Sequence, residues 1–242
     1  MKRLTVSVDD IAFLRYVFND HDFDPTQFAI LCEVAGASGI SATFPAKSSG
    51  VSERDIKLLK QLHKTFFNLH LPLNPESLKI ALTLSPDMVT FVDLQPGDPV
   101  KLAPLPAYQI EESLSSSLPD FHANGISVAV YCEPEISILK TLSKLEIDYV
   151  EFDCTGYTRA SDSNEELVGL DKLNSATMAA AKLGFGINCF GNIDYYHLSS
   201  LAAIPRLEDI CMGEALLKRS FLVGVNQAIA EAKQEILFHH QE

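Results

Sequence analysis

His70 and Glu151 are the two residues of this sequence that we expect to move protons in a catalytic site. Each lies in a short apolar run, and histidine is the side chain whose ordinary pKa lies closest to neutral pH. An imidazole beside Glu151 or Asp9 would form an acid/base pair. Each residue also has a structural alternative. His70 could be a buried, hydrogen-bonded core residue, and Glu151 could form an ion pair with Arg15 or another cation.

Two glycine-bearing turns could bind a phosphate group. Gly191-Asn192 and Gly213-Glu214 each follow an apolar run, and backbone N–H groups at such turns commonly bind phosphate. In the alternative interpretation the glycines only satisfy the turn geometry. Glu214 would then place the chain's own carboxylate at the start of a helix, where an anion would otherwise bind.

Asp9, Asp10 and Thr43 complete the set of residues that we expect to contact a substrate. The two aspartates, with Asp153 and Glu214, could instead form an acidic ring that holds Mg²⁺. Their spacing does not match a metal-binding motif, and solvent-exposed acidic residues are far more common in loops. We therefore predict no metal and no cofactor.

The elements that position these residues alternate between short strands and longer helices. Such alternation along a whole chain is typical of βα units around a parallel sheet. Eight strands are predicted, at 4–8, 39–43, 66–71, 88–92, 126–132, 148–153, 185–189 and 209–212. Eight strand-then-helix units in this length predict a single-domain (β/α)₈ TIM barrel over residues 1–242, with its site at the carboxyl ends of the strands.

The helices are predicted from apolar spacing and capping residues. They are expected at 28–36, 52–62, 74–82, 110–124, 134–145, 165–183, 195–203 and 215–238. Residues 93–107 contain five prolines or glycines, a density that predicts a long loop. Lys101 in this loop and Lys47 could close over a ligand, although solvated surface lysines are the common case.

Composition and charge narrow the classes of function. The chain has 242 residues, 47% of them hydrophobic, which is enough for one core. With 19 basic and 32 acidic residues its net charge is −13, so nucleic acid is an unfavourable partner. No segment resembles a signal peptide or a membrane span, so we expect a cytoplasmic protein without a membrane partner. The five cysteines are expected to be buried, reduced thiols, since no close pair is present.

Several segments together resemble the pyridoxine 5′-phosphate synthase family. They are residues 6–15 (VSVDDIAFLR), 35–40 (AGASGI), 52–55 (SERD), 68–71 (NLHL), Glu151 with Tyr157, and 201–205 (LAAIP). The resemblance extends over essentially the whole chain. It implies a (β/α)₈ barrel, usually octameric, that condenses 1-deoxy-D-xylulose 5-phosphate with 3-amino-2-oxopropyl phosphate to form the pyridine ring of vitamin B6.

The chain departs from the family's motifs mainly where they carry histidine or arginine. Ser7 and Asp10 replace the Asn and His of Asn-x-Asp-His; Thr43, Pro45 and Gly50 replace His-x-Arg and a further His; His70 replaces the Glu of Asn-Leu-Glu; Phe190-Gly191-Asn192 replaces Gly-His-Gly; and Gly213-Glu214 replaces Gly-His. Acid/base groups and phosphate-binding cations are lost, and carboxylates near a phosphate dianion are unfavourable. The family's substrates should therefore bind poorly.

Two hypotheses follow. In the first, the chain is a divergent, catalytically impaired synthase, or it acts on a related small phosphorylated carbonyl compound with His70 and Glu151 as proton carriers. In the second, it is a non-catalytic barrel that binds a small ligand or assembles with a catalytic relative. A small phosphorylated metabolite is the expected partner, and the resemblance implies a homo-oligomer, namely an octamer.

Overall fold

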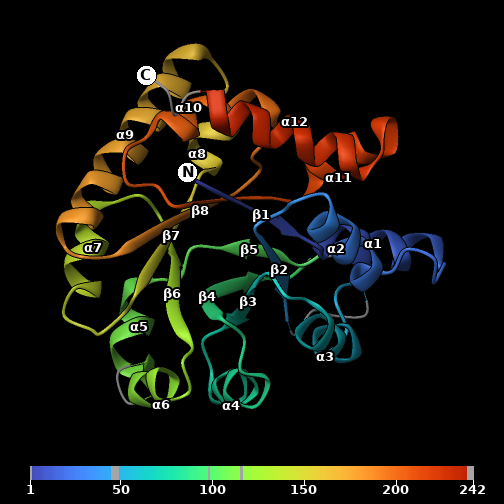
Figure 1. Ribbon diagram of the computed structural model, residues 1–242. Coiled ribbons are helices and arrows are strands. Elements are labelled where there is room, and N and C mark those ends of the chain that lie inside the picture. Colours follow the sequence, from blue (N-terminus) through green and yellow to red (C-terminus); the bar gives the residue numbers. More distant parts are fainter. Residues whose placement is uncertain (1, 45–48, 98, 115–116, 239–242) are drawn as a thin grey trace.

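The chain folds as a closed barrel of eight parallel strands surrounded by helices (Figure 1). The computed structural model describes residues 2–44, 49–97, 99–114 and 117–238. The barrel strands are β1 (Arg3–Ser7), β2 (Gly39–Thr43), β3 (Phe66–Pro72), β4 (Met88–Gln95), β6 (Ser127–Cys132), β7 (Tyr149–Asp153), β8 (Gly186–Phe190) and β9 (Asp209–Met212). The predicted single-domain (β/α)₈ TIM barrel is confirmed.

Neighbouring strands pair in parallel all the way around the barrel. Pairing of β1 with both β2 and β9 joins the first strand to the last, and pairing of β3 with β4 and of β4 with β6 completes the ring. All eight strands therefore end at the same face. We call this end, formed by the carboxyl ends of the strands, the barrel mouth.

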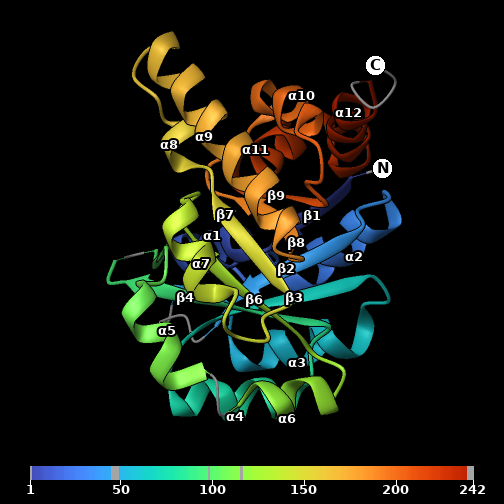
Figure 2. The same cartoon turned by 90° about the vertical axis from the view of Figure 1, so that its left-hand side faces the viewer.

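Several of the helices begin at a residue whose side chain caps them. Their bounds are α1 (Asp9–Phe18), α2 (Pro25–Val34), α3 (Glu53–Leu62), α4 (Pro75–Leu84), α5 (Ala107–Leu114), α6 (Leu118–Ala123), α7 (Ile136–Leu142), α8 (Thr155–Thr158), α9 (Ser163–Lys182), α10 (Tyr195–Ala203), α11 (Glu214–Val223) and α12 (Val225–Phe238). Ser52 and Asp55 form a capping box on α3, and the side chain of Asn74 caps α4. Figure 2 shows how these helices surround the strands.

The proline-rich segment at 93–107 is more regular than predicted. β4 continues to Gln95 and pairs antiparallel with a short strand, β5 (Lys101–Ala103). Pro96 and Pro99 lie in the turn between the two strands, where no ladder hydrogen bond from a backbone N–H is needed. The predicted long loop is therefore in part a β-hairpin beside the barrel.

Two long helix predictions were wrong in their extent, and the helix after the first strand was missed. α1 was not predicted, because the segment after the first strand was interpreted as polar. The predicted helix at 110–124 is two helices, and Pro119 lies in the first turn of the second one, α6. The predicted helix at 215–238 is divided at Gly224, whose φ of 82° is incompatible with a continuous helix.

The core lies mainly between the sheet and its helices, while the barrel interior is unusually polar. Buried side chains such as Ile40, Phe67 and Val130 belong to one continuous apolar cluster. The cysteines at 32, 132, 154, 189 and 211 are buried and free, as predicted. None of the helices in the described part of the chain combines the length and hydropathy needed to cross a lipid bilayer.

Candidate functional site at the barrel mouth

A cavity of about 1140 Å³ opens at the barrel mouth. Its walls include all seven residues predicted to contact a substrate: Asp9, Asp10, Thr43, Gly191, Asn192, Gly213 and Glu214. They come from four strand ends, since parallel strands place their carboxyl-terminal residues at one face. We call this space the mouth cavity. His70 and Glu151 are not among the residues that line it.

Asp9 is held in place by the neighbouring strand β2. Its carboxylate accepts hydrogen bonds from the backbone N–H of Thr43 at 2.8 Å and from the Thr43 hydroxyl at 2.7 Å. The Ser7 hydroxyl donates a third, at 3.1 Å. These donors stabilise a negative charge at the entrance to the barrel. An anionic ligand would be repelled at this point.

Asp10 is the acidic group of the mouth cavity whose pKa is most altered. Burial, and then the negative charges of Asp9 and Glu214, raise the pKa of Asp10 to about 7. Glu214 begins α11 and forms an ion pair with Lys218, one turn further along, at 2.5 Å. The mouth cavity therefore contains a carboxyl group that changes charge near neutral pH.

The turn after β8 depends on a glycine. Gly191 has a φ of 117°, and a Cβ atom placed there would lie 2.5 Å from Oδ1 of Asp153. Its carbonyl accepts a hydrogen bond from the Thr158 hydroxyl at 2.9 Å. Asn192 follows with a φ of 50°, a left-handed conformation that asparagine adopts more readily than most residues. The turn is thereby held against α8.

We expect Gly191→Ala to destabilise the fold by about 1–3 kcal/mol, because the methyl group meets Asp153 and the backbone conformation is unfavourable for alanine. Urea denaturation would measure this change. Gly156→Ala is the matched control, since a Cβ there contacts nothing within 4 Å. Equal stability of the two variants would show that the turn does not require glycine.

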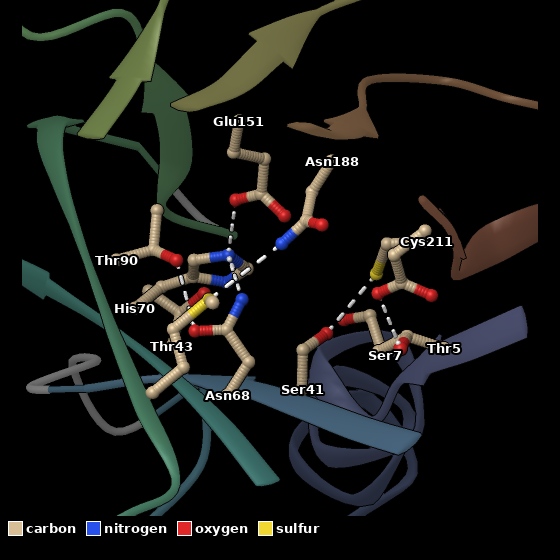
Figure 3. A network of polar contacts seen from close by, with 12 residues as sticks. Thr5, Ser7, Ser41, Thr43, Asn68, His70, Thr90, Glu151, Asn188 and Cys211 are labelled. Carbon is tan, nitrogen blue, oxygen red and sulfur yellow. Dashed lines mark hydrogen bonds and ion pairs between the residues drawn. The ribbon is translucent and has the colours of Figure 1, made fainter. Parts of the chain in front are cut away.

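His70 and Glu151 meet inside the barrel, below the mouth cavity (Figure 3). The His70 Nε2 and Glu151 Oε2 atoms are 2.7 Å apart, and both residues are at most 1% exposed. Burial disfavours the imidazolium form of His70, but the Glu151 carboxylate outweighs this effect and raises the pKa of His70 above its ordinary value. The structure therefore brings these two residues together, in the buried, hydrogen-bonded position of the alternative interpretation of His70.

Phe190, which lines the mouth cavity, stacks on the ring of the buried His70. The His70 ring stacks on Phe190, with ring centroids 5.6 Å apart, and Phe190 contacts Tyr131 with centroids 6.2 Å apart. Phe190 and Tyr131 both line the mouth cavity. A ligand in the cavity would therefore contact these rings rather than His70 or Glu151.

The alternative ion pair between Glu151 and Arg15 was wrong. Arg15 forms a two-pronged ion pair with Asp55 of α3, with N–O distances of 3.0 and 2.7 Å. Arg15 lies on α1, outside the barrel, whereas the Glu151 side chain points into it (Figure 3). The two side chains are thus on opposite sides of the sheet.

Further polar side chains surround the buried pair inside the barrel (Figure 3). Asn68 accepts a hydrogen bond from the Thr90 hydroxyl at 2.8 Å, and its amide lies 3.5 Å from the His70 ring. The Thr5 hydroxyl donates to Asp209 at 2.7 Å. Burial is the main cause that raises the pKa of Asp209 to about 7. The interior of this barrel therefore holds titratable groups.

Three cations at the mouth cavity were missed by the sequence analysis. They are Arg159, Lys218 and Arg219. Lys101 on β5, which the sequence analysis considered, also lines the cavity. Arg159 ends the short helix α8, within a stretch interpreted only as polar and turn-rich. Its position six residues after the end of a predicted strand was the available signal. Pro45 and Lys47 lie outside the described residues.

The acidic-ring alternative finds no support in the geometry. Within the described ranges, no three His, Cys, Asp or Glu side chains are grouped so that they could hold a metal ion. Asp153, one member of the ring, instead accepts hydrogen bonds from the backbone N–H and the hydroxyl of Thr155, at 2.9 and 2.6 Å.

Comparisons with known proteins agree on one family. Residues 4–237 match the sequence profile of the family described as Pyridoxal phosphate biosynthesis protein PdxJ. The pyridoxine 5′-phosphate synthase of Geobacter metallireducens is 29% identical over 231 residues, which are 96% of this chain and 97% of that protein. The synthase of Syntrophobacter fumaroxidans is 30% identical over 237 residues, covering 96% of this chain and 97% of that protein.

Solved structures share the fold at much lower identity. KGPDC from Streptococcus mutans superposes with a TM-score of 0.65 at 11% identity, covering 98% of this chain and 97% of that one. The 3-hexulose-6-phosphate synthase of Salmonella typhimurium gives a TM-score of 0.64 at 12% identity, covering 98% and 100%. At these identities the similarity shows the barrel architecture alone.

Proposed function

Because this chain belongs to the PdxJ family of pyridoxal phosphate biosynthesis proteins, we propose that it binds a small phosphorylated compound in the mouth cavity and performs the synthase reaction weakly or not at all. The observation that carries this proposal is the position of the His70–Glu151 pair. Both residues are at most 1% exposed and neither lines the mouth cavity, whereas Phe190, which stacks on His70, does line it. A group that transfers a proton must come within hydrogen-bond reach of the substrate.

The charges of the mouth cavity support the same proposal. Asp9, Asp10 and Glu214 all line it. Asp10 and Glu214 occupy positions where the family resemblance implies histidine, and Asp9 corresponds to an aspartate of the family. Condensation of the two family substrates would require binding two phosphate groups. The cations at the cavity, among them Arg159, are sufficient in number to bind one of these two phosphate groups.

A second candidate is catalysis on a related small phosphorylated carbonyl compound. Asp10 favours it, because this residue lines the mouth cavity and its pKa of about 7 suits a group that gains and loses a proton near neutral pH. In this candidate Asp10, and not the buried His70, moves the proton. Turnover that disappears in Asp10→Asn and persists in Glu214→Gln would favour it.

The deciding experiment measures synthase turnover and ligand binding in the same preparation. With 1-deoxy-D-xylulose 5-phosphate and 3-amino-2-oxopropyl phosphate, we expect pyridoxine 5′-phosphate at a rate at least about 100-fold below that of the Geobacter metallireducens relative, because acid/base groups commonly contribute that factor. Calorimetry should still detect binding of one phosphorylated substrate. Turnover equal to that of the relative would refute the proposal.

A further inference from the structure

Arg159 differs from Lys218 and Arg219, two other cations of the mouth cavity, in the partner that it contacts. Its guanidinium donates a hydrogen bond of 2.6 Å to the side-chain oxygen of Asn192, a neutral amide. Among the residues that the structure describes, no carboxylate lies within ion-pair distance of it. Since arginine stays charged at every physiological pH, Arg159 brings a full positive charge to the cavity.

Two neighbouring cations are already neutralised. Lys218 pairs with Glu214 at 2.5 Å, and Arg219 forms a two-pronged ion pair with Glu231 at 2.7 and 3.0 Å. An anionic ligand would have to compete with these carboxylates. Arg159 lies close enough to Lys218 to oppose the protonation of that lysine, so an anion bound at Arg159 would also relieve repulsion between the two cations.

The Arg159 side chain is held by a chain of hydrogen bonds between α8 and the turn after β8. The Asn192 amide nitrogen donates to the Thr155 hydroxyl at 3.4 Å, and this hydroxyl donates to Asp153 at 2.6 Å. The link from Thr158 to Gly191 joins the same two segments. A guanidinium ordered before binding loses less entropy when a ligand arrives.

We propose that Arg159, oriented by Asn192, binds the phosphate group of the ligand in the mouth cavity. This inference rests on the proposed function and deepens it, because it names the ligand's anchor as a phosphate monoester. The planar guanidinium can bind two phosphate oxygens at once. The site lies at the ends of β7 and β8, the sixth and seventh strands of the barrel. The turn after the seventh strand belongs to the region where TIM barrels commonly bind phosphate. In this chain the positive charge that attracts the phosphate comes from the Arg159 side chain.

The test is a titration with inorganic phosphate, followed by NMR, of the unaltered chain and four variants. We expect Arg159→Gln to weaken phosphate binding at least about tenfold, the usual effect of a lost charge-assisted hydrogen bond. Asn192→Asp should weaken it to a similar extent, because the new carboxylate neutralises Arg159 while the shape of the turn is kept. Arg54→Gln, which removes one exposed charge from α3, should bind like the unaltered chain.

The outcomes separate the two proposals. If the unaltered chain binds phosphate and Arg159→Gln binds it equally well, the assignment of Arg159 is overturned and the proposed function stands. If the unaltered chain binds neither inorganic phosphate nor 3-amino-2-oxopropyl phosphate, the proposed function fails and the assignment fails with it. Arg159→Lys is expected to bind with intermediate affinity, since it keeps the charge and loses the planar fork. Thermal unfolding would verify that each variant is folded.

Discussion

Replacing His70 by alanine is expected to lower the free energy of unfolding by about 3–5 kcal/mol at pH 7, the usual cost of leaving one member of a buried ion pair without its partner. The Glu151 carboxylate would remain in the barrel without the ring that lies 2.7 Å away. A void would also form beside Phe190, which stacks on that ring. Urea denaturation at constant pH measures the change.

The double variant His70→Leu with Glu151→Met is the informative control. It removes both charges and fills the same space with apolar side chains, an exchange that is often neutral for a buried pair. We expect it to recover most of the stability lost in His70→Ala. A double variant as unstable as the single one would show that packing, and not the unpaired charge, causes the loss.

Asp10→Asn is expected to raise the free energy of unfolding by about 2–4 kcal/mol at pH 8. The carboxyl group has a pKa of about 7 in the folded chain, against an ordinary value of 3.8, and each unit of difference corresponds to about 1.4 kcal/mol. Between these two values the folded state holds a proton that the unfolded state releases. Stability therefore falls as the pH rises through this window and levels off above it.

The measurement is urea denaturation between pH 4 and pH 8 for the unaltered chain and the variant. The difference in the free energy of unfolding between the two proteins should grow with pH, since asparagine does not titrate. Asp171→Asn, which changes an exposed carboxylate on α9, should show no such growth. A constant difference between Asp10→Asn and the unaltered chain would contradict the explanation.

Other buried groups also make the free energy of unfolding fall as the pH rises. Burial raises the pKa of Asp209 to about 7, and the raised pKa of His70 means that its contribution is present at low pH and lost as the pH rises through its folded value. The Asp10→Asn variant should therefore still lose stability between about pH 4 and pH 8.

Much of the barrel could be predicted because its signals are local. A strand of four to six apolar residues, followed by a cap such as Ser52 or Asn74, identifies a βα unit without knowledge of the rest of the chain. Errors arose where a few residues decide whether a helix continues or whether a loop forms a hairpin. Gly224 divides a helix whose apolar spacing continues past it, and the prolines of the β4–β5 turn are compatible with a hairpin as well as with a loop.

The residues of the mouth cavity could be predicted for a related reason. Parallel strands end at one face, so the residues after each strand gather there whatever their chemistry. This rule placed Asp9, Gly191 and Glu214 at one cavity. It could not find Arg159, because the direction of a long side chain depends on the neighbours that bind it, and here that neighbour is Asn192, 33 residues further along the chain.

The sequence by itself determined the family, the barrel and the residues gathered at its mouth, because strand patterns and motif order are properties of the chain. Only the tertiary structure decided which of these residues face a ligand. A strand residue near the mouth points into the cavity or into the barrel below it according to register and packing. Phe190 over His70 is the contact that hides the acid/base pair, and burial beside other carboxylates is what brings the pKa of Asp10 close to neutral pH.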